Sequence, residues 1–453
     1  MLHAIGDLFT RISARVTPNP FAFALLLTLV VAVVGVLLTD NGFLEMATFW
    51  YRGFWDLLSF AMQIVIILIS GHVLATSPPA RRVITKLSDL PKTAGQAILL
   101  IAFVTSIAGF MNWGIGLVTG AVMAVTVSSS GRARGIRIHY PLAAAAGYMG
   151  LLIFGNGFSS SAPLLVNTDG HFLIDEIGLV PLDQTILTGF NIATALLFLI
   201  VIPLLLRAMH PPPEKCQEVE PDVVDAFAPE APSVDRTTGP IRSLGDLVDH
   251  SRALAMPLAG IGLAVVLWLL VSGTVALDLN SLNFLLVMSG LALYGNPVAY
   301  VRAIDRAVHT SSGVILQFPF YAGIMGMMSL SGLVAIFAGG MVSVSTAATL
   351  PITAFLSSAL VNLFVPSAGG QWAVQGPIIV EAAQALEVPI GTMIMAFAYG
   401  DQLTNMIQPF WAVPLLGITS LNARDLLGYT AVAMIAALFI FLFGLTVLPS
   451  LFA

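Results

Sequence analysis

Four stretches of this sequence place hydrogen-bonding and helix-breaking residues inside otherwise apolar segments. They read GFMNWGIG at 109–116, GNGFSSSAPLLVNT at 155–168, FVPSAGGQWAVQGP at 364–377 and GDQLTNMIQPFW at 400–411. Hydroxyls, amides and the N-termini of interrupted helices suit an anionic carboxylate, whereas freed backbone carbonyls suit a small hard cation. We therefore predict that the four stretches meet and bind a small solute.

The residues expected to bind the solute are neutral polar, glycine and tryptophan residues of these stretches. They are Asn112, Trp113, Gly114, Ser159, Ser160, Ser161, Asn167, Thr168, Ser367, Gly369, Gly370, Gln371, Trp372, Thr404 and Asn405. No Lys or Arg occurs in any of the four stretches, which favours a small monocarboxylate over a multiply charged acid. For any single Ser or Thr, hydrogen bonding between neighbouring helices is an alternative role, and both tryptophans could equally be packing residues.

The candidates for a coupling-ion site are Asp401, Asn156 and Gln402. A carboxylate at the centre of a membrane helix costs about 2.5–3.5 kcal/mol on insertion scales, so Asp401 suggests a bound cation or a transported proton. The alternatives are that Asp401 lies nearer an interface or caps the helix after the break. The expected ion is Na⁺ or H⁺, and we predict no other cofactor and no fixed metal site.

The composition indicates a multi-pass membrane protein. The 453 residues are 57% hydrophobic and 9% charged, against about 25% charged residues in soluble domains. A single cysteine excludes a disulfide-stabilised secreted domain, and a net charge of −6 spread over loops argues against nucleic acid as a partner. The ATP-binding motif GxxxxGK[ST] is absent, and no HExxH, CxxC or GxSxG motif occurs in a usable context, so we do not expect an enzyme.

Runs without charged residues predict the helices, since a transmembrane helix needs about 20 apolar residues. The predicted full spans lie at 16–39, 57–80, 138–168, 184–206, 253–277, 279–301, from 307 onward, at 402–423 with a start near Pro389, and at 426–448. Two further segments, about 94–128 and 347–387, are interrupted in the middle. One half of such a segment, for example the 14 residues 115–128, would form a helix about 21 Å long. The hydrocarbon core is about 30 Å thick, so this helix would be too short to cross it. We therefore predict re-entrant hairpins, with two short tilted helices as the alternative.

Lys and Arg orient the chain because cytoplasmic loops are enriched in them. The loops at 77–92 and 132–137 carry seven such residues, which predicts that both loops and the N-terminus are cytoplasmic. The two halves then have opposite orientations. The predicted order is a first repeat at 1–206, a flexible polar cytoplasmic linker at 207–252, a connecting span at 253–278 and a second repeat at 279–453. An all-α fold of two inverted repeats, each with a hairpin and an interrupted helix, is typical of secondary transporters.

Three motifs carry a resemblance that covers about Pro18 to Leu448. They are MNWGIGLVTGA at 111–121, FVPSAGGQWAVQGPI at 364–378 and GDQLTNMIQPFWAVPLLGI at 400–418. With these motifs the chain resembles the short-chain fatty acid transporter family of the ion transporter superfamily. The resemblance implies a bacterial inner-membrane protein that imports butyrate- or acetoacetate-like acids with a coupling cation, by alternating access and as a homodimer.

Some relatives in the superfamily carry a Ser-Asn-Thr signature at the hairpin tips. Here Asn112 and Ser367 lie at the tips, but the full triplet is missing from both. Sodium ligands therefore do not transfer directly from the resemblance. A passive channel or facilitator for small weak acids or other small anions is the alternative function.

Overall fold

The computed structural model describes residues 20–223, 243–275, 277–308, 311–363 and 368–452. Every regular element within these ranges is a helix, which confirms the all-α prediction. Seven helical segments there are long and apolar enough to cross a membrane, and a further pair bent by 79° can add an eighth span. The chain is therefore a multi-pass membrane protein.

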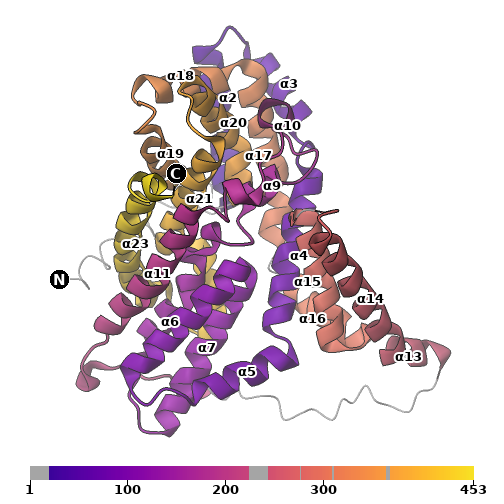
Figure 1. The fold of residues 1–453 in the computed structure, drawn as a ribbon, viewed down its shortest axis with the longest axis vertical. Coiled ribbons are helices and arrows are strands. Elements are labelled where there is room, and N and C mark those ends of the chain that lie inside the picture. The colour runs from indigo at the N-terminus through magenta and orange to yellow at the C-terminus, as the bar shows by residue number, and fades with distance from the viewer. Residues whose placement is uncertain (1–19, 224–242, 276, 309–310, 364–367, 453) are drawn as a thin grey trace.

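The helices that contact one another most form two groups. The first group consists of α2 (Pro20–Leu38), α3 (Phe43–Gly53), α4 (Leu58–Ala75), α14 (Arg252–Val271), α15 (Leu279–Tyr294), α16 (Pro297–Val308) and α17 (Ser312–Ser331). The helix α18 (Leu333–Ser343) follows α17 but packs mainly on α20 (Ala368–Ala385) of the second group. In Figure 1, α14, α15 and α16 stand at the lower right, across α4 from α6 and α7 of the second group. The two groups meet where α4 packs on α7 and where α17 packs on α20.

The second group contains two helix hairpins, two interrupted helices and two long helices. The hairpins are α6 (Ala94–Met111) with α7 (Trp113–Ala133) and α19 (Leu350–Asn362) with α20 (Ala368–Ala385). The interrupted helices are α8 (Tyr140–Gly147), η1 (Tyr148–Leu152), η2 (Phe154–Asn156) and α9 (Ser161–Val166), and α21 (Ile390–Thr404), η6 (Asn405–Ile407) and α22 (Pro409–Thr419). The long helices are α11 (Gly189–Ala208) and α23 (Ala423–Thr446).

The first interrupted helix forms the centre of the molecule. Of its apolar window, 94% is buried inside the protein, compared with 17% for the window that contains α14. The apolar side chains of α14 therefore face the surroundings, as expected for a helix in lipid, whereas the segment from α8 to α9 is covered by protein on all sides.

Both hairpins differ in detail from the predicted limbs. α7 has 21 residues where 14 were expected, because the helix continues through the polar sequence SSSGRA at its end. α20 begins at Ala368, so the Gly-Gly-Gln-Trp sequence, which we expected to be irregular, is helical. Gly369 and Gly370 allow the rings of Phe60 and Tyr321 to approach the backbone. That the hairpins are re-entrant stays a prediction.

Two predicted full spans are broken. The predicted span 279–301 ends early, because Gly295 (φ 75°) terminates α15 and Pro297 starts the separate helix α16. The next helix, α17, ends at Gly332 (φ 84°), from which α18 continues at a sharp angle. The amphipathic helices α3 and α5 (Pro78–Ser88) were not predicted, because charged residues interrupt them.

Small residues allow the central helices to touch backbone to backbone. A Cβ atom on Gly120 of α7 would overlap the carbonyl group of Gly147 in α8, and a Cβ on Gly109 of α6 would overlap the backbone of Gly150 in η1. These contacts press the first hairpin against the first interrupted helix, and they fix the position of the turn between α6 and α7.

Candidate functional site

A single residue, Asn112, makes the turn of the first hairpin. Its extended backbone (φ −160°, ψ 128°) separates α6 from α7. Its N–H donates to the carbonyl of Ala108 (2.8 Å), and its Oδ1 accepts from the N–H of Ile115 (3.0 Å), so the residue ends one helix and caps the next. Asn112 is 1% exposed, and its Nδ2 has no hydrogen-bond partner among the described residues. A buried donor thus remains available at the N-terminus of α7.

The tip of the first hairpin also contacts the first interrupted helix and the first helix group. The N–H of Trp113 donates to Oγ of Ser159 (2.9 Å). On the other side, Gly71 of α4 lies against Asn112 and Gly114, where a larger residue would overlap Oδ1 of Asn112. The tip is therefore held between both helix groups.

The second hairpin is joined along its length by glutamine side chains. Nε2 of Gln371, in α20, donates to the carbonyl of Ser358 in α19 (2.8 Å) and to Oε1 of Gln375 (3.0 Å). Oε1 of Gln371 is buried and has no partner among the described residues. Trp372 packs edge-on against Phe397, with ring centroids 4.8 Å apart, and so fills the core. Ser367, predicted to bind substrate, lies outside the described residues.

The two interrupted helices are linked by a closed network of buried amides. Oε1 of Gln402 accepts from the N–H of Gly155 (2.6 Å), and its Nε2 donates to Oδ1 of Asn156 (2.8 Å). Asn156 in turn donates to Oδ1 of Asn191 in α11 (2.9 Å), which also accepts from the hydroxyl of Tyr399 (2.8 Å). The side-chain amides of Asn156 and Gln402, both predicted to lie at the ion site, are thus hydrogen-bonded to protein groups. They connect the two interrupted helices to each other.

A second polar cluster surrounds the break between α21 and α22. Nδ2 of Asn362, at the end of α19, donates to Oγ1 of Thr404 (3.0 Å), to Oδ1 of Asn405 (2.8 Å) and to the carbonyl of Asp401. Nε2 of Gln408 donates to the carbonyl of Asn362. This cluster ties the second hairpin to the second interrupted helix. Asn362 was not among the predicted residues, since one amide at the end of an apolar limb looks like an ordinary helix end.

Asp401 lies inside α21, three residues before its last residue, and is 2% exposed. It is therefore neither at an exposed interface nor at the start of the following helix. One carboxylate oxygen, Oδ1, has no hydrogen-bond partner among the described residues, and neither does the Oδ1 of Asn362 or the Oε1 of Gln408. A buried, unpaired carboxylate is costly, so these oxygens are the strongest cation candidates in the described structure.

The four predicted stretches meet at one small cavity of about 30 Å³. Each stretch contributes a lining residue, namely Trp113, Ser161, Gly369 and Asn405. The remaining lining residues are Ile64, Leu151, Phe154, Ala368 and Trp411. The cavity is therefore polar on a few atoms and apolar over most of its wall, as small-molecule sites are.

Two tryptophan rings form the apolar wall of the cavity. Trp113, from the first hairpin, and Trp411, from α22, pack edge to face with centroids 5.3 Å apart. A cavity of this volume holds about one water molecule, far less than the about 300 Å³ of a small ligand pocket. In the described conformation the cavity is thus too small for a bound small-molecule ligand.

Several predicted residues lie away from the cavity. Nδ2 of Asn167 donates to the carbonyl of Leu277 (3.1 Å), and Oγ1 of Thr168 accepts from the N–H of Leu279 (3.4 Å). Both therefore connect α9 to the start of α15. Ser160 is the buried residue that precedes α9. Trp411 is the reverse case: it lines the cavity and belongs to the fourth stretch, but it was not among the predicted binding residues.

The sequence matches known proteins along nearly its whole length. The family model described as "Short chain fatty acid transporter" matches residues 1–448. A protein of Escherichia coli (strain K12) is 38% identical over 98% of this chain and 100% of its own length, and one of Haemophilus influenzae is 36% identical over 98% of this chain and 99% of its own length; each is named "Putative short-chain fatty acid transporter".

Two solved structures share the fold. The Alcanivorax borkumensis YdaH transporter, described as having an unusual topology, has a TM-score of 0.60 at 18% identity and covers 95% of this chain and 97% of its own. Neisseria gonorrhoeae MtrF, described with a class of antimetabolite efflux pumps, has a TM-score of 0.57 at 15% identity, over 96% and 97%. Identities this low extend the likeness to the fold alone. The match along the whole chain, together with the two curated relatives, shows that this protein belongs to the short-chain fatty acid transporter family.

Proposed function

We propose that the protein is a secondary active transporter that imports short-chain monocarboxylates, of the butyrate or acetoacetate type, together with a coupling cation. The observation that carries this proposal is the cavity to which all four interrupted stretches contribute. Its apolar walls suit a short hydrocarbon tail, and family membership supports the same substrate class. Since the described residues that line the cavity include no Lys or Arg, a bound acid would be recognised through neutral donors.

In this proposal the carboxylate is bound at the tip of the first hairpin. Nδ2 of Asn112 is a buried donor without a described partner, and it lies where the N-terminus of α7 adds positive potential. The N-terminus of α20 begins beside the cavity at Ala368. The hydrocarbon tail would then lie against Trp113, Trp411 and Phe154.

The coupling cation would be bound or carried by Asp401. Oδ1 of Asp401 would bind the cation together with Oδ1 of Asn362 and Oε1 of Gln408, which also lack a hydrogen-bond partner among the described residues. All three residues belong to the hydrogen-bonded cluster around the break between α21 and α22. An oxygen site of this kind suits Na⁺, and a buried carboxylate can alternatively carry H⁺. A site that holds a cation next to the substrate would also offset the charge of the acid.

Uptake into proteoliposomes tests the proposal. Labelled butyrate uptake is measured with a Na⁺ gradient at equal pH, and separately with a pH gradient without Na⁺. Protein-free liposomes correct for the neutral acid that crosses lipid unaided. We expect saturable accumulation above the external concentration with one of the two gradients. Uptake that does not change with either gradient would contradict coupling to a cation. Equilibration without saturation would favour a passive facilitator.

The direction of transport needs its own measurement, because a protein of the same fold, MtrF, is described with efflux pumps. Vesicles with known orientation of the protein are loaded with labelled butyrate, and the gradient is applied in each direction. In the proposed symport, butyrate moves in the same direction as the cation, so an inward cation gradient drives import. Movement of butyrate against the cation flow would replace import with antiport.

A further inference from the structure

The helix α5 exposes basic and apolar side chains on one short element. Ile84 is buried against the rest of the protein, whereas Arg82 and Lys86 are exposed. Val83 is 56% exposed, and Leu90, two residues beyond the end of the helix, is 62% exposed. Two cations and two large apolar side chains therefore share the outer surface of this segment.

The helical period places these residues next to one another. Each residue turns the helix by about 100°, so Lys86 lies about 60° from Val83 around the axis, and Arg82 lies about 40° further on. By the same spacing Thr85 lies about 160° from Val83, on the opposite side of α5. A helix that carries Lys and Arg beside apolar side chains is typical of helices that lie in the plane of a membrane surface.

The position of α5 in the fold agrees with a membrane surface. The helix follows α4, which is apolar and long enough to cross a membrane. Oγ of Ser77 accepts from the N–H of Ala80 (3.4 Å), and Pro78 is the first helical residue, so a new helix starts directly after α4. In Figure 1, α5 leaves the lower end of α4 and runs across the view toward the lower end of α7. This places α5 at the level of the lipid headgroups.

The end of α5 is fixed by α7. The guanidinium of Arg134 donates to the carbonyls of Ser88 (3.1 Å), Asp89 (2.9 Å) and Pro91 (2.7 Å). Oγ of Ser130 donates to Oδ1 of Asp89 (2.7 Å), the only acidic residue between positions 78 and 92. These contacts hold the helix at a fixed rotation, and they direct its one nearby carboxylate toward α7.

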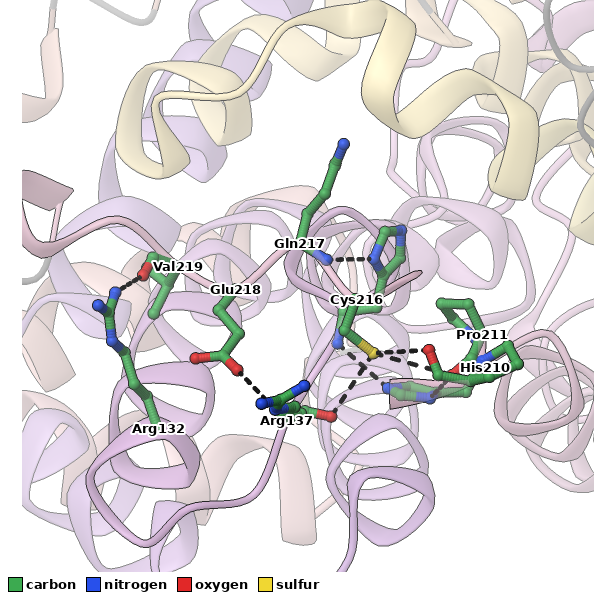
Figure 2. Close-up of polar contacts among 10 residues, drawn as sticks. Arg132, Arg137, His210, Pro211, Cys216, Gln217, Glu218 and Val219 are labelled. Carbon is green, nitrogen blue, oxygen red and sulfur yellow. Dashed lines mark hydrogen bonds and ion pairs between the residues drawn. The ribbon is translucent and has the colours of Figure 1, made fainter. Parts of the chain in front are cut away.

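Other basic residues beside α7 are engaged with protein groups. Figure 2 shows the first part of the predicted linker, where Arg132 donates to the carbonyl of Val219 and Arg137 forms an ion pair with Glu218 (3.7 Å). Val219 is 1% exposed, so this part of the linker is packed against the protein. The side chains of Arg82 and Lys86 form no hydrogen bond or ion pair with the residues that the structure describes.

We propose that α5 binds the headgroups of anionic phospholipids, with Arg82 and Lys86 facing the phosphates and Val83 and Leu90 in contact with the start of the acyl chains. Each Lys or Arg near an anionic membrane surface adds to the attraction, and the apolar side chains gain by leaving water. A free phosphate ion would match the two charges but not the apolar side chains beside them. Because α5 connects α4 to α7, the lipid would bind the segment that links the two helix groups.

A fluorescent probe on α5 tests this proposal. Cys216 is the only cysteine, so Cys216→Ser with Val83→Cys has a single site for an environment-sensitive maleimide dye. The labelled full-length protein is placed in nanodiscs of phosphatidylcholine with increasing fractions of phosphatidylglycerol. A lipid with a nitroxide near the start of its acyl chain serves as the quencher. We expect quenching to increase severalfold as the phosphatidylglycerol fraction rises.

A second probe position is the matched control. Thr85→Cys in the same background places the dye on the opposite side of α5, where Thr85 is exposed. The nitroxide lipid should quench this dye weakly at every lipid composition. Equal quenching at the two positions would show that α5 presents no defined side to the bilayer, which would overturn the proposal.

Removal of charge tests the two cations. Arg82→Gln with Lys86→Gln should abolish the dependence of the Val83→Cys signal on phosphatidylglycerol. Lys215→Gln with Arg252→Gln removes two exposed positive charges away from α5 and should preserve that dependence. If the first double variant does not fold, high salt applied to the protein with its native charges is the second readout, because salt screens contacts between exposed charges.

Three further results would overturn lipid binding by α5. The first is Val83→Cys quenching that is the same with and without phosphatidylglycerol. The second is reversal of the phosphatidylglycerol effect by inorganic phosphate, which would indicate a site for a free anion. The third is a salt response of equal size in pure phosphatidylcholine, which would indicate an acidic protein segment. Butyrate uptake enters none of these readouts, so failure of the proposed function would leave this proposal standing.

Discussion

Asn112 and Gln402 are both buried amides at interrupted helices, but they differ in hydrogen bonding. Both ends of the Gln402 amide are bound to protein, to the N–H of Gly155 and to Asn156. Asn112 uses only its oxygen, to cap α7, and keeps an unpartnered buried donor. A buried donor without a partner costs about 1–3 kcal/mol. Asn112 is not itself among the lining residues of the cavity, but its neighbour Trp113 is, and the proposed carboxylate contact rests on this unpartnered donor.

We expect Asn112→Asp to remove uptake while preserving the fold. The variant keeps the capping oxygen but replaces the donor with a second acceptor of negative charge, which repels a carboxylate. Butyrate uptake at low concentration should fall by about tenfold or more, equivalent to about 1.4 kcal/mol of lost binding. Initial uptake rates and the melting temperature of the purified protein check this.

Asn296→Asp is the matched control for Asn112→Asp. Oδ1 of Asn296 accepts from the N–H of Ala299 (2.9 Å) at the start of α16, away from the cavity, and an aspartate preserves that contact. Uptake by this variant should match the native rate. Normal uptake by Asn112→Asp would show that the first hairpin tip does not bind the carboxylate.

Asp401→Asn is expected to separate substrate binding from coupling. The amide cannot carry a proton and binds Na⁺ less strongly than a carboxylate, so the applied gradient should no longer drive accumulation. Exchange of internal for external butyrate needs no net cation movement and should persist. Gradient-driven uptake and counterflow are measured on the same vesicles, and accumulation at the native level in the variant would rule out Asp401 as the coupling residue.

The site could be predicted from the sequence only where polar residues cluster. Four clusters in apolar runs were apparent in the sequence, and each contributes one or two residues to the wall of the cavity. Their partners were not found, because Asn191, Asn362 and Tyr399 are single polar residues within helices, where hydrogen bonding between helices is the usual explanation. The hydrogen bond between Asn156 and Gln402 could not be predicted either, because the two residues are far apart in the sequence and only the folded structure brings them together.

At the scale of the helices, the contact between α7 and α8 sets the position of the hairpin. Gly120→Ala should separate the two backbones, since its Cβ would overlap the carbonyl of Gly147. Overpacking of this kind costs about 1–3 kcal/mol, so the melting temperature in detergent should fall. Gly260→Ala, on the exposed α14 where nothing lies within 4 Å of the added Cβ, should leave it unchanged. Equal melting temperatures for the two variants would contradict the close contact.

Hydrophobicity predicted where the helices lie more reliably than it predicted the residues at which they begin and end. The starts of α4, α15 and α23 lie close to the predicted spans because charged loops bound them. The ends of α7 and the start of α20 were wrong, because glycine and serine continue a helix when neighbouring helices bury them. The break at Gly295 was missed because the spans were predicted from runs without charged residues, although a left-handed glycine followed by Pro297 is a common local signal for the end of a helix.

At the scale of the whole molecule, the proposed function predicts that substrate and coupling cation bind the folded protein and therefore stabilise it by linkage. If binding of one favours the other, the rise in melting temperature with butyrate and the coupling cation together should exceed the sum of the separate rises, because coupling is reciprocal. Thermal unfolding in detergent measures this. Butylamine, which has a similar tail and no carboxylate, is the control, and additive shifts would indicate independent sites.

The overall division into two helix groups was only partly accessible from the sequence. Charge placement predicted the order of the spans, but not that α4 and α17 would provide the surface against which the hairpins pack. That surface depends on contacts such as Gly71 against Asn112 and Gly369 against Phe60, which involve residues far apart in the chain. The predicted inverted symmetry remains a prediction.

The turn between α6 and α7 is one residue long, and this restricts how the chain can change in length. Each added or removed residue rotates the following helix by about 100°. An insertion beside Asn112 would therefore turn the Gly116 and Gly120 face of α7 away from α6 and α8, which it touches at Gly109 and Gly147. The relative rotation of α6 and α7 about their axes is therefore fixed by the backbone of Asn112 alone, and we expect insertions and deletions to be tolerated in the loops outside the hairpin rather than at its turn.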